Sequence, residues 1–134
     1  TMEEAWEAAR MAGMEEDIKS MPMGMHTMVS TDGGTLSGGQ RQRLLIARAI
    51  ISRPKIIYFD EATSALDNRT QKIVSESLAG LGATRIVIAH RLSTIASCNK
   101  IIVMDKGRIV EQGSYQELFE KEGLFTQLVK RQLA

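Results

Sequence analysis

One feature constrains the possible fold of this sequence more than any other. It is a glycine pair that is followed along the chain by two adjacent acidic residues at the end of an apolar run. Residues 36–40 read Leu-Ser-Gly-Gly-Gln, and a stretch of basic and apolar residues with helical spacing follows them. The glycines leave the backbone uncovered, and Ser37 offers a hydroxyl. A helix that begins here points unpaired N–H groups and the positive end of its dipole at an anion. The sequence therefore predicts a helix start that faces phosphate.

The second half of this stretch predicts a buried strand that ends in carboxylates. Residues 55–60 form a mainly apolar run after Pro54, and Asp60 and Glu61 close it. Two carboxylates cannot enter a core without a cation or a ligand that compensates their charge. We therefore expect them at the C-terminal end of the strand, where open α/β sheets bind ligands. A phosphate-facing helix start together with such a carboxylate pair indicates nucleoside triphosphate chemistry.

The remaining pattern predicts alternating helices and strands. Helices are expected over residues 1–19, 37–52, 68–81, 92–96, 114–120 and 124–133, and strands over residues 55–60, 84–89, 100–104 and 108–111. Gly13 allows the first helix to split in two. The first two strands read as fully buried and, with the helix between them, predict a βαβ unit whose helix is capped by Asp67. The last two strands predict an antiparallel hairpin. Arg41 and Arg43 could form a solvated basic face, and little supports the alternative that they contact phosphate, so we leave them out of the site.

Four segments resemble motifs of the ATP-binding cassette (ABC) ATPases, and they occur in the order of that family. Residues 36–40 resemble the signature motif, residues 56–61 the Walker B strand with its catalytic glutamate, residues 64–67 the D-loop, and residues 88–93 the switch-histidine segment. A glycine pair alone marks ordinary turns, whereas four motifs in order are specific. The chain therefore resembles the C-terminal portion of an ABC ATP-binding domain over essentially its whole length.

The resemblance implies an α/β fold of the P-loop NTPase type, present in part. It implies parallel strands with flanking helices, part of the helical subdomain, and a C-terminal hairpin plus helices. Residues 1–52 correspond to the helical subdomain with the signature motif, and residues 53–134 to the Walker B, D-loop, switch-histidine and C-terminal elements. The Walker A pattern G-x-x-x-x-G-K-[ST] does not occur in the 134 residues. We expect a fragment of a longer transporter that is inactive alone, with a natural short gene product as the alternative.

The resemblance also implies a role for each candidate residue. Asp60 would hold Mg²⁺, Glu61 would act as the catalytic carboxylate, and His90 would contact the γ-phosphate of ATP. A second ATP-binding domain would share the nucleotide in a head-to-tail dimer, and the signature residues facing that ATP are Ser37, Gly38, Gly39 and Gln40. Asp67 would line the dimer interface, although N-capping alone also explains it. The alternatives are that Asp60 and Glu61 form a solvated strand end and that His90 is a structural histidine.

The implied function is ATP-coupled export across a membrane. Residues 62–67 and 89–95 resemble the corresponding segments of ABC exporters. Residues 6–13 and 21–27 are similar to segments of bacterial peptide and bacteriocin exporters. The partners would be a second ATP-binding domain and the transporter's transmembrane domain, at the cytoplasmic face of the bacterial plasma membrane. Seven of the eight methionines lie within residues 2–28. They would either fill a small helical core or form an adaptable docking surface for another protein. The fragment itself is expected to be soluble, because no apolar run approaches the roughly 18 residues of a membrane span.

Two alternatives from other classes stay open. One is a non-catalytic interaction module that binds a partner protomer or a membrane subunit without hydrolysis. The other is a DNA-associated ABC ATPase, which would require coiled-coil heptads or a basic DNA-binding face. A net charge of +1 and 4% aromatic residues give no drive toward nucleic acid, so no nucleic-acid partner is expected.

Overall fold

The computed structural model of the protein describes residues 1–30, 34–60 and 66–133. The chain divides into two compact units, Thr1–Ile88 and Ala89–Ala134. Among the described residues, no helix is both long and apolar enough to cross a membrane. Each unit has its own hydrophobic core.

The first unit contains helices and two strands in the predicted order. Its elements are α1 (Met2–Met11), α2 (Glu15–Ser20), the 3₁₀ turn η1 (Gly24–His26), α3 (Gly38–Ile50), β1 (Ile56–Asp60), α4 (Asn68–Gly80) and β2 (Thr84–Ile88). The split of the first helix at Gly13 is confirmed. Gly13 has φ +70°, a left-handed conformation that only glycine adopts without cost, so the chain turns there between α1 and α2.

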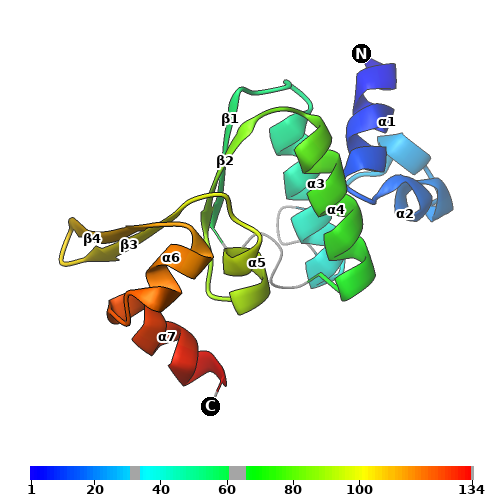
Figure 1. The fold of residues 1–134 in the computed structure, drawn as a ribbon. Coiled ribbons are helices and arrows are strands. Elements are labelled where there is room, and N and C mark those ends of the chain that lie inside the picture. Colours follow the sequence, from blue (N-terminus) through cyan, green and yellow to red (C-terminus); the bar gives the residue numbers. More distant parts are fainter. Residues whose placement is uncertain (31–33, 61–65, 134) are drawn as a thin grey trace. The chain divides into compact units, whose positions relative to one another are not determined.

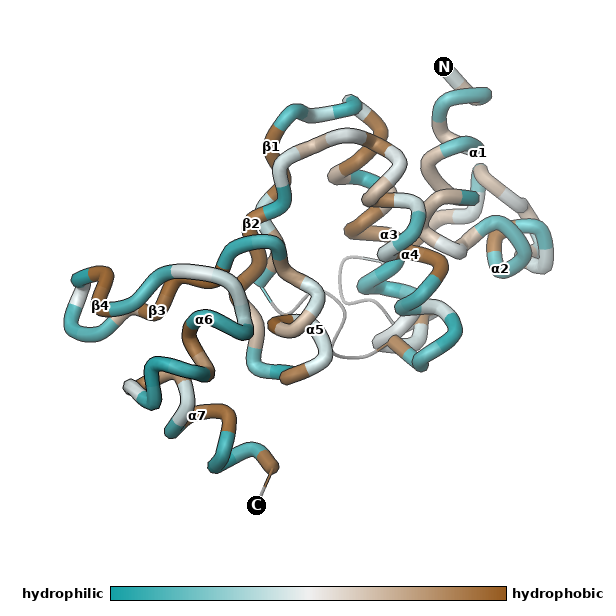
Figure 2. The backbone as a smooth tube through the Cα atoms, viewed as in Figure 1, coloured by the Kyte–Doolittle hydropathy of each residue, from teal (hydrophilic) through white to brown (hydrophobic). Residues whose placement is uncertain are grey.

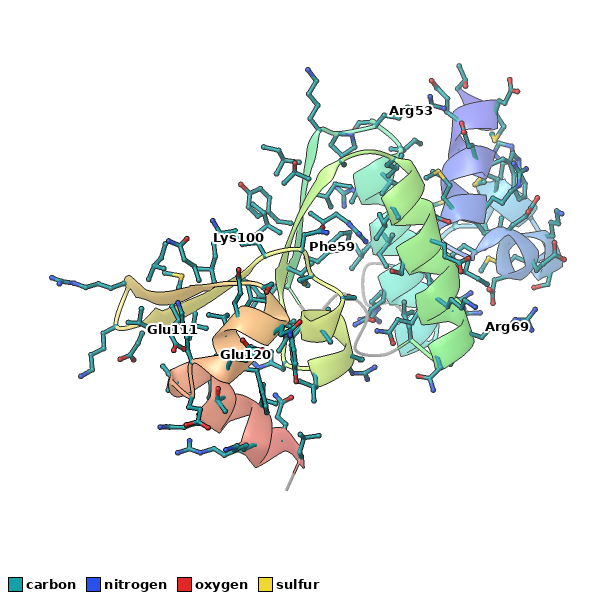
Figure 3. All side chains as sticks on the ribbon, in the orientation of Figure 1. Arg53, Phe59, Arg69, Lys100, Glu111 and Glu120 are labelled. Atoms are coloured by element: carbon teal, nitrogen blue, oxygen red, sulfur yellow. The ribbon has the colours of Figure 1, made fainter. Side chains whose placement is uncertain are left out.

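The predicted βαβ unit is confirmed. Strands β1 and β2 pair in parallel, with Ile56 opposite Thr84 and Asp60 opposite Ile88, and α4 connects them. Helices α3 and α4 lie along one face of the strand pair (Figure 1). The core between them contains Ile57 and Phe59 from β1 together with Ile46, Ile50, Val74 and Leu78 from the helices. Figure 3 shows Phe59 between the strands and α3.

The prediction that both strands are fully buried is wrong. Strand β1 alternates, with Ile57 at 4% exposure and Tyr58 at 73%. Ile86 and Ile88 of β2 are exposed as well. Side chains of a strand point alternately to the two faces of a sheet, and only one face packs against helices in the described part of this unit. Some of the apolar residues that Figure 2 colours brown along β1 and β2 therefore lie on the uncovered face.

Over its described residues, 89–133, the second unit consists of a hairpin and three helices. Its elements are α5 (Leu92–Ala96), β3 (Ile101–Asp105), β4 (Arg108–Gly113), α6 (Tyr115–Glu120) and α7 (Leu124–Leu133). The predicted hairpin is confirmed, since β3 and β4 pair antiparallel across a turn in which Lys106 and Gly107 both have positive φ. Its core consists of Ile101, Val103, Leu118, Phe125 and Val129.

Candidate functional site

The start of α3 has the geometry predicted for the signature segment. Ser37 is the N-cap, and its Oγ accepts a hydrogen bond from the Gln40 backbone N–H at 3.1 Å. The Gln40 Oε1 accepts in return from the Ser37 backbone N–H at 2.9 Å, which completes a capping box. Ser37 and Gly38 are exposed. The Ser37 hydroxyl accepts through its oxygen and keeps its own proton to donate, so this helix start can bind an anion.

The strand-end carboxylate lies where the sequence predicted it. Asp60 is the last residue of β1, is exposed, and stands opposite the last residue of β2. Glu61 follows Asp60 and lies outside the described residues. Across residues 1–30, 34–60 and 66–133, no group of three His, Cys, Asp or Glu side chains could hold a metal ion. The Asp60 carboxylate is an oxygen ligand of the kind that Mg²⁺ binds together with phosphates and water.

Asp67 is the N-cap of α4, as predicted. Its Oδ1 accepts a hydrogen bond from the Thr70 backbone N–H at 2.7 Å. This backbone hydrogen bond, then the Thr70 side chain, and more weakly the charge of Arg43, lower the pKa of the Asp67 carboxyl below its ordinary value. In Figure 1 the start of α3, the end of β1 and the start of α4 lie at the same end of the first unit. The structure thus brings the signature segment, Asp60 and Asp67 to one edge.

His90 belongs to the second unit and follows the end of β2 by two residues. Its side chain is exposed, and its backbone carbonyl accepts a hydrogen bond from the Gln132 Nε2 at 2.7 Å. This bond ties the segment at His90 to the last turn of α7. The γ-phosphate role of His90 stays a prediction.

The interpretation of Arg43 as part of a solvated face is wrong. Its side chain is only 15% exposed and pairs with Asp17 of α2, Nη1 to Oδ2, at 2.6 Å. The Gln40 Nε2 donates to the other carboxylate oxygen of Asp17 at 2.7 Å. Sequence reasoning missed Asp17, because it follows Glu15 and Glu16 and reads as one more acidic residue suited to a helix start.

The lowered pKa of Asp67 predicts an acid-sensitive stability. A carboxyl whose pKa is lower in the folded chain stabilises the fold above its unfolded pKa, near about 4. That stabilisation is lost as pH falls through the folded value. Asp67→Asn keeps the cap but cannot titrate, so we expect acidification from neutral pH to about pH 2 to lower the stability of the variant less than that of the parent chain. Urea unfolding at each pH measures this.

The matched control is Glu76→Gln, which removes an exposed carboxylate from the middle of the same helix. It should leave the acid dependence close to that of the parent chain. Equal pH dependence of the parent chain and Asp67→Asn would contradict the prediction.

The first unit is an α/β arrangement in which a βαβ unit has an exposed, capped helix start and a strand-end carboxylate at the same end, as in the class of open α/β proteins that bind ligands at the C-terminal ends of their strands. The family profile described as "ABC transporter" matches residues 1–64. A solved structure of a bacterial Atm1-family ABC exporter with ATP bound has a TM-score of 0.95 to this chain at 42% identity. The chain belongs to the ABC transporter family, and the predicted fold class is confirmed.

Relatives of known name support the same family. The chain is 52% identical over 132 residues to a mitochondrial potassium channel ATP-binding subunit of Rattus norvegicus, and 51% identical over 132 residues to multidrug resistance protein 1 of Entamoeba histolytica. Each match covers 97% of this chain. The chain spans 18% and 10% of the length of these two relatives. It is covered completely by the Atm1-family exporter and spans 24% of that chain.

Proposed function

We propose that this chain is part of the ATP-binding domain of an ABC exporter, and that the whole protein couples ATP binding and hydrolysis to export. The observation that carries the proposal is that the start of α3, the end of β1 and the start of α4 lie at the same end of the first unit (Figure 1). The high similarity to an exporter solved with ATP bound supports it. Residues 1–52 form part of the helical subdomain, and residues 53–134 carry the remaining motifs.

The helix start of α3 binds nucleotide from one side only. Its cap leaves an exposed serine and two glycines for a γ-phosphate, while the sequence contains no Walker A pattern to hold the β- and γ-phosphates. The proposed arrangement is the head-to-tail dimer that the resemblance implies, in which a second ATP-binding domain holds the ATP that this segment contacts. Asp67 lines the interface between the two domains. The signature residues that approach this ATP are Ser37, Gly38, Gly39 and Gln40.

Each remaining site residue has one task in hydrolysis. Asp60 would hold Mg²⁺ through water, because a carboxylate oxygen at the strand end is a ligand that this ion accepts together with phosphates and water. When bound, the ion neutralises charge on the phosphates. Glu61 orients or deprotonates the attacking water. His90 contacts the γ-phosphate, and the hydrogen bond between its carbonyl and Gln132 supports the backbone there.

The transmembrane domain of the exporter is the second partner, and it meets the methionine-rich segment, residues 2–28. Met14 is fully buried with Ala9 and Ile18, whereas Met23 and Met28 are 61% and 83% exposed. The buried residue fills the small core, and the exposed ones form a surface that can repack against a partner. A peptide or bacteriocin is the proposed substrate, on the similarity of residues 6–13 and 21–27 to exporters of that kind. The site of action is the cytoplasmic face of the bacterial plasma membrane.

Calorimetry of ATP binding tests the proposal. We expect the 134-residue chain alone to show negligible binding and turnover, because it lacks the lysine and backbone amides of a phosphate loop. Adding a second polypeptide that carries the phosphate-loop half should restore binding and turnover. Tight ATP binding by the chain alone would contradict the shared-nucleotide arrangement. Binding of the chain to a membrane subunit, with no turnover in any mixture, would favour the non-catalytic interaction module.

A further inference from the structure

We propose that Asp17 is a positioning residue for the signature segment and sets the affinity of the protein for ATP held by the partner domain. The inference rests on the proposed function, because it concerns how the start of α3 meets that nucleotide. Asp17 lies on α2, outside the four recognised motifs, and does not face the anion itself. It acts through two side chains of α3, Gln40 and Arg43.

Asp17 fixes the orientation of the Gln40 amide. An ionised carboxylate only accepts hydrogen bonds, so Asp17 Oδ1 holds the Gln40 Nε2 at 2.7 Å. The Gln40 Oε1 then faces the Ser37 backbone N–H, from which it accepts at 2.9 Å. If the amide were rotated by half a turn, its NH₂ group would meet that N–H and the capping box would open. The carboxylate thus determines the conformation of the Ser37 backbone that begins the phosphate-facing turn.

Arg43 connects the same carboxylate to the signature backbone. Its Nη1 donates to Asp17 Oδ2 at 2.6 Å and to the Gly13 carbonyl at 2.5 Å. Its Nε reaches the Gly39 carbonyl at 3.4 Å. The guanidinium therefore spans from the turn between α1 and α2 to the second glycine of the signature segment. With the Arg43 and Asp17 side chains 15% and 26% exposed, this pair is shielded more than the surface ion pairs of α2.

Packing against the rest of the first unit holds helix α2, and with it this carboxylate, in place. Ile18, the residue after Asp17, is 6% exposed and lies in a small core with Ala9 and Met14, against which Leu44 of α3 packs. Packing thus fixes the separation of α2 and α3, while Asp17 adds the polar link at the N-terminal end of α3. Removing the carboxylate should loosen the signature turn and leave the packed helices in place.

The test uses the full-length transporter and measures KM and kcat for ATP together with the melting temperature. Losing a shielded hydrogen bond to a charged group corresponds to about a tenfold change in an equilibrium. We expect Asp17→Ala to raise the KM for ATP about tenfold and the isosteric Asp17→Asn to raise it less, because the amide oxygen still accepts from Gln40. Glu16→Gln is the matched control, because it removes an 86% exposed carboxylate from the same helix, and it should leave KM unchanged.

A double variant separates positioning from general stability. If Asp17 acts through Gln40, Asp17→Ala combined with Gln40→Ala raises KM no further than Gln40→Ala alone. A fall in melting temperature with unchanged KM, or fully additive changes in KM, would overturn the inference. Failure of the proposed function would give a different result, because Ser37→Ala and Gln40→Ala would then leave KM for ATP unchanged. If those two variants raise KM and Asp17→Ala does not, only the role of Asp17 falls.

Discussion

Glu61→Gln in the full-length transporter is expected to lower ATP turnover by about 10²- to 10⁴-fold, the range that a positioned general base contributes. The change replaces a proton acceptor by an amide of the same shape, so the attacking water is no longer deprotonated. Binding of ATP should remain, because the groups proposed to contact its phosphates are unchanged. Phosphate release at saturating Mg²⁺ and ATP measures the loss, and calorimetry under the same conditions measures binding.

Two controls make this result specific. Glu76→Gln removes an exposed carboxylate of α4 and should leave turnover unchanged. Asp60→Asn should also slow turnover, and raising the Mg²⁺ concentration should restore part of its activity, because Asp60 is proposed to act through the metal ion. No Mg²⁺ concentration should restore Glu61→Gln. Turnover of Glu61→Gln within twofold of the parent would remove Glu61 from the mechanism.

Local patterns allowed the elements that form the site edge to be predicted from sequence. The sequence predicts Asp67 as an N-cap because a capping side chain bonds the N–H three residues on, and this bond is present. It predicts the helix start at Ser37 from the glycine pair and the helical spacing that follows, and the structure adds that Ser37 is itself a cap. The apolar run before Asp60 predicted a strand, and short connections predicted its parallel partner. These features depend on neighbours within a few residues, which the sequence displays directly.

The errors arose where a residue's environment depends on distant parts of the chain. Arg43 meets Asp17 across 26 residues and the Gly13 carbonyl across 30. Helical spacing reports which face of α3 a residue occupies, but not what lies against that face. The prediction that β1 and β2 are fully buried is wrong for the same reason, because an apolar run predicts a strand without showing how many of its faces are covered. Side-chain partners across elements come only from the three-dimensional structure.

Leu118→Ala is expected to destabilise the second unit by about 2–5 kcal/mol, the usual cost of a large cavity in a core. Leu118 is 0% exposed and packs in the cluster with Ile101, Val103, Phe125 and Val129, which joins α6 and α7 to the hairpin. The control is Leu128→Ala on α7, which removes the same atoms from a side chain that is 44% exposed. Urea unfolding followed by circular dichroism should show a large shift for the first variant and a small one for the second. Equal shifts would mean that this cluster does not hold the unit together, and that the support of α7 for the His90 segment through Gln132 has another origin.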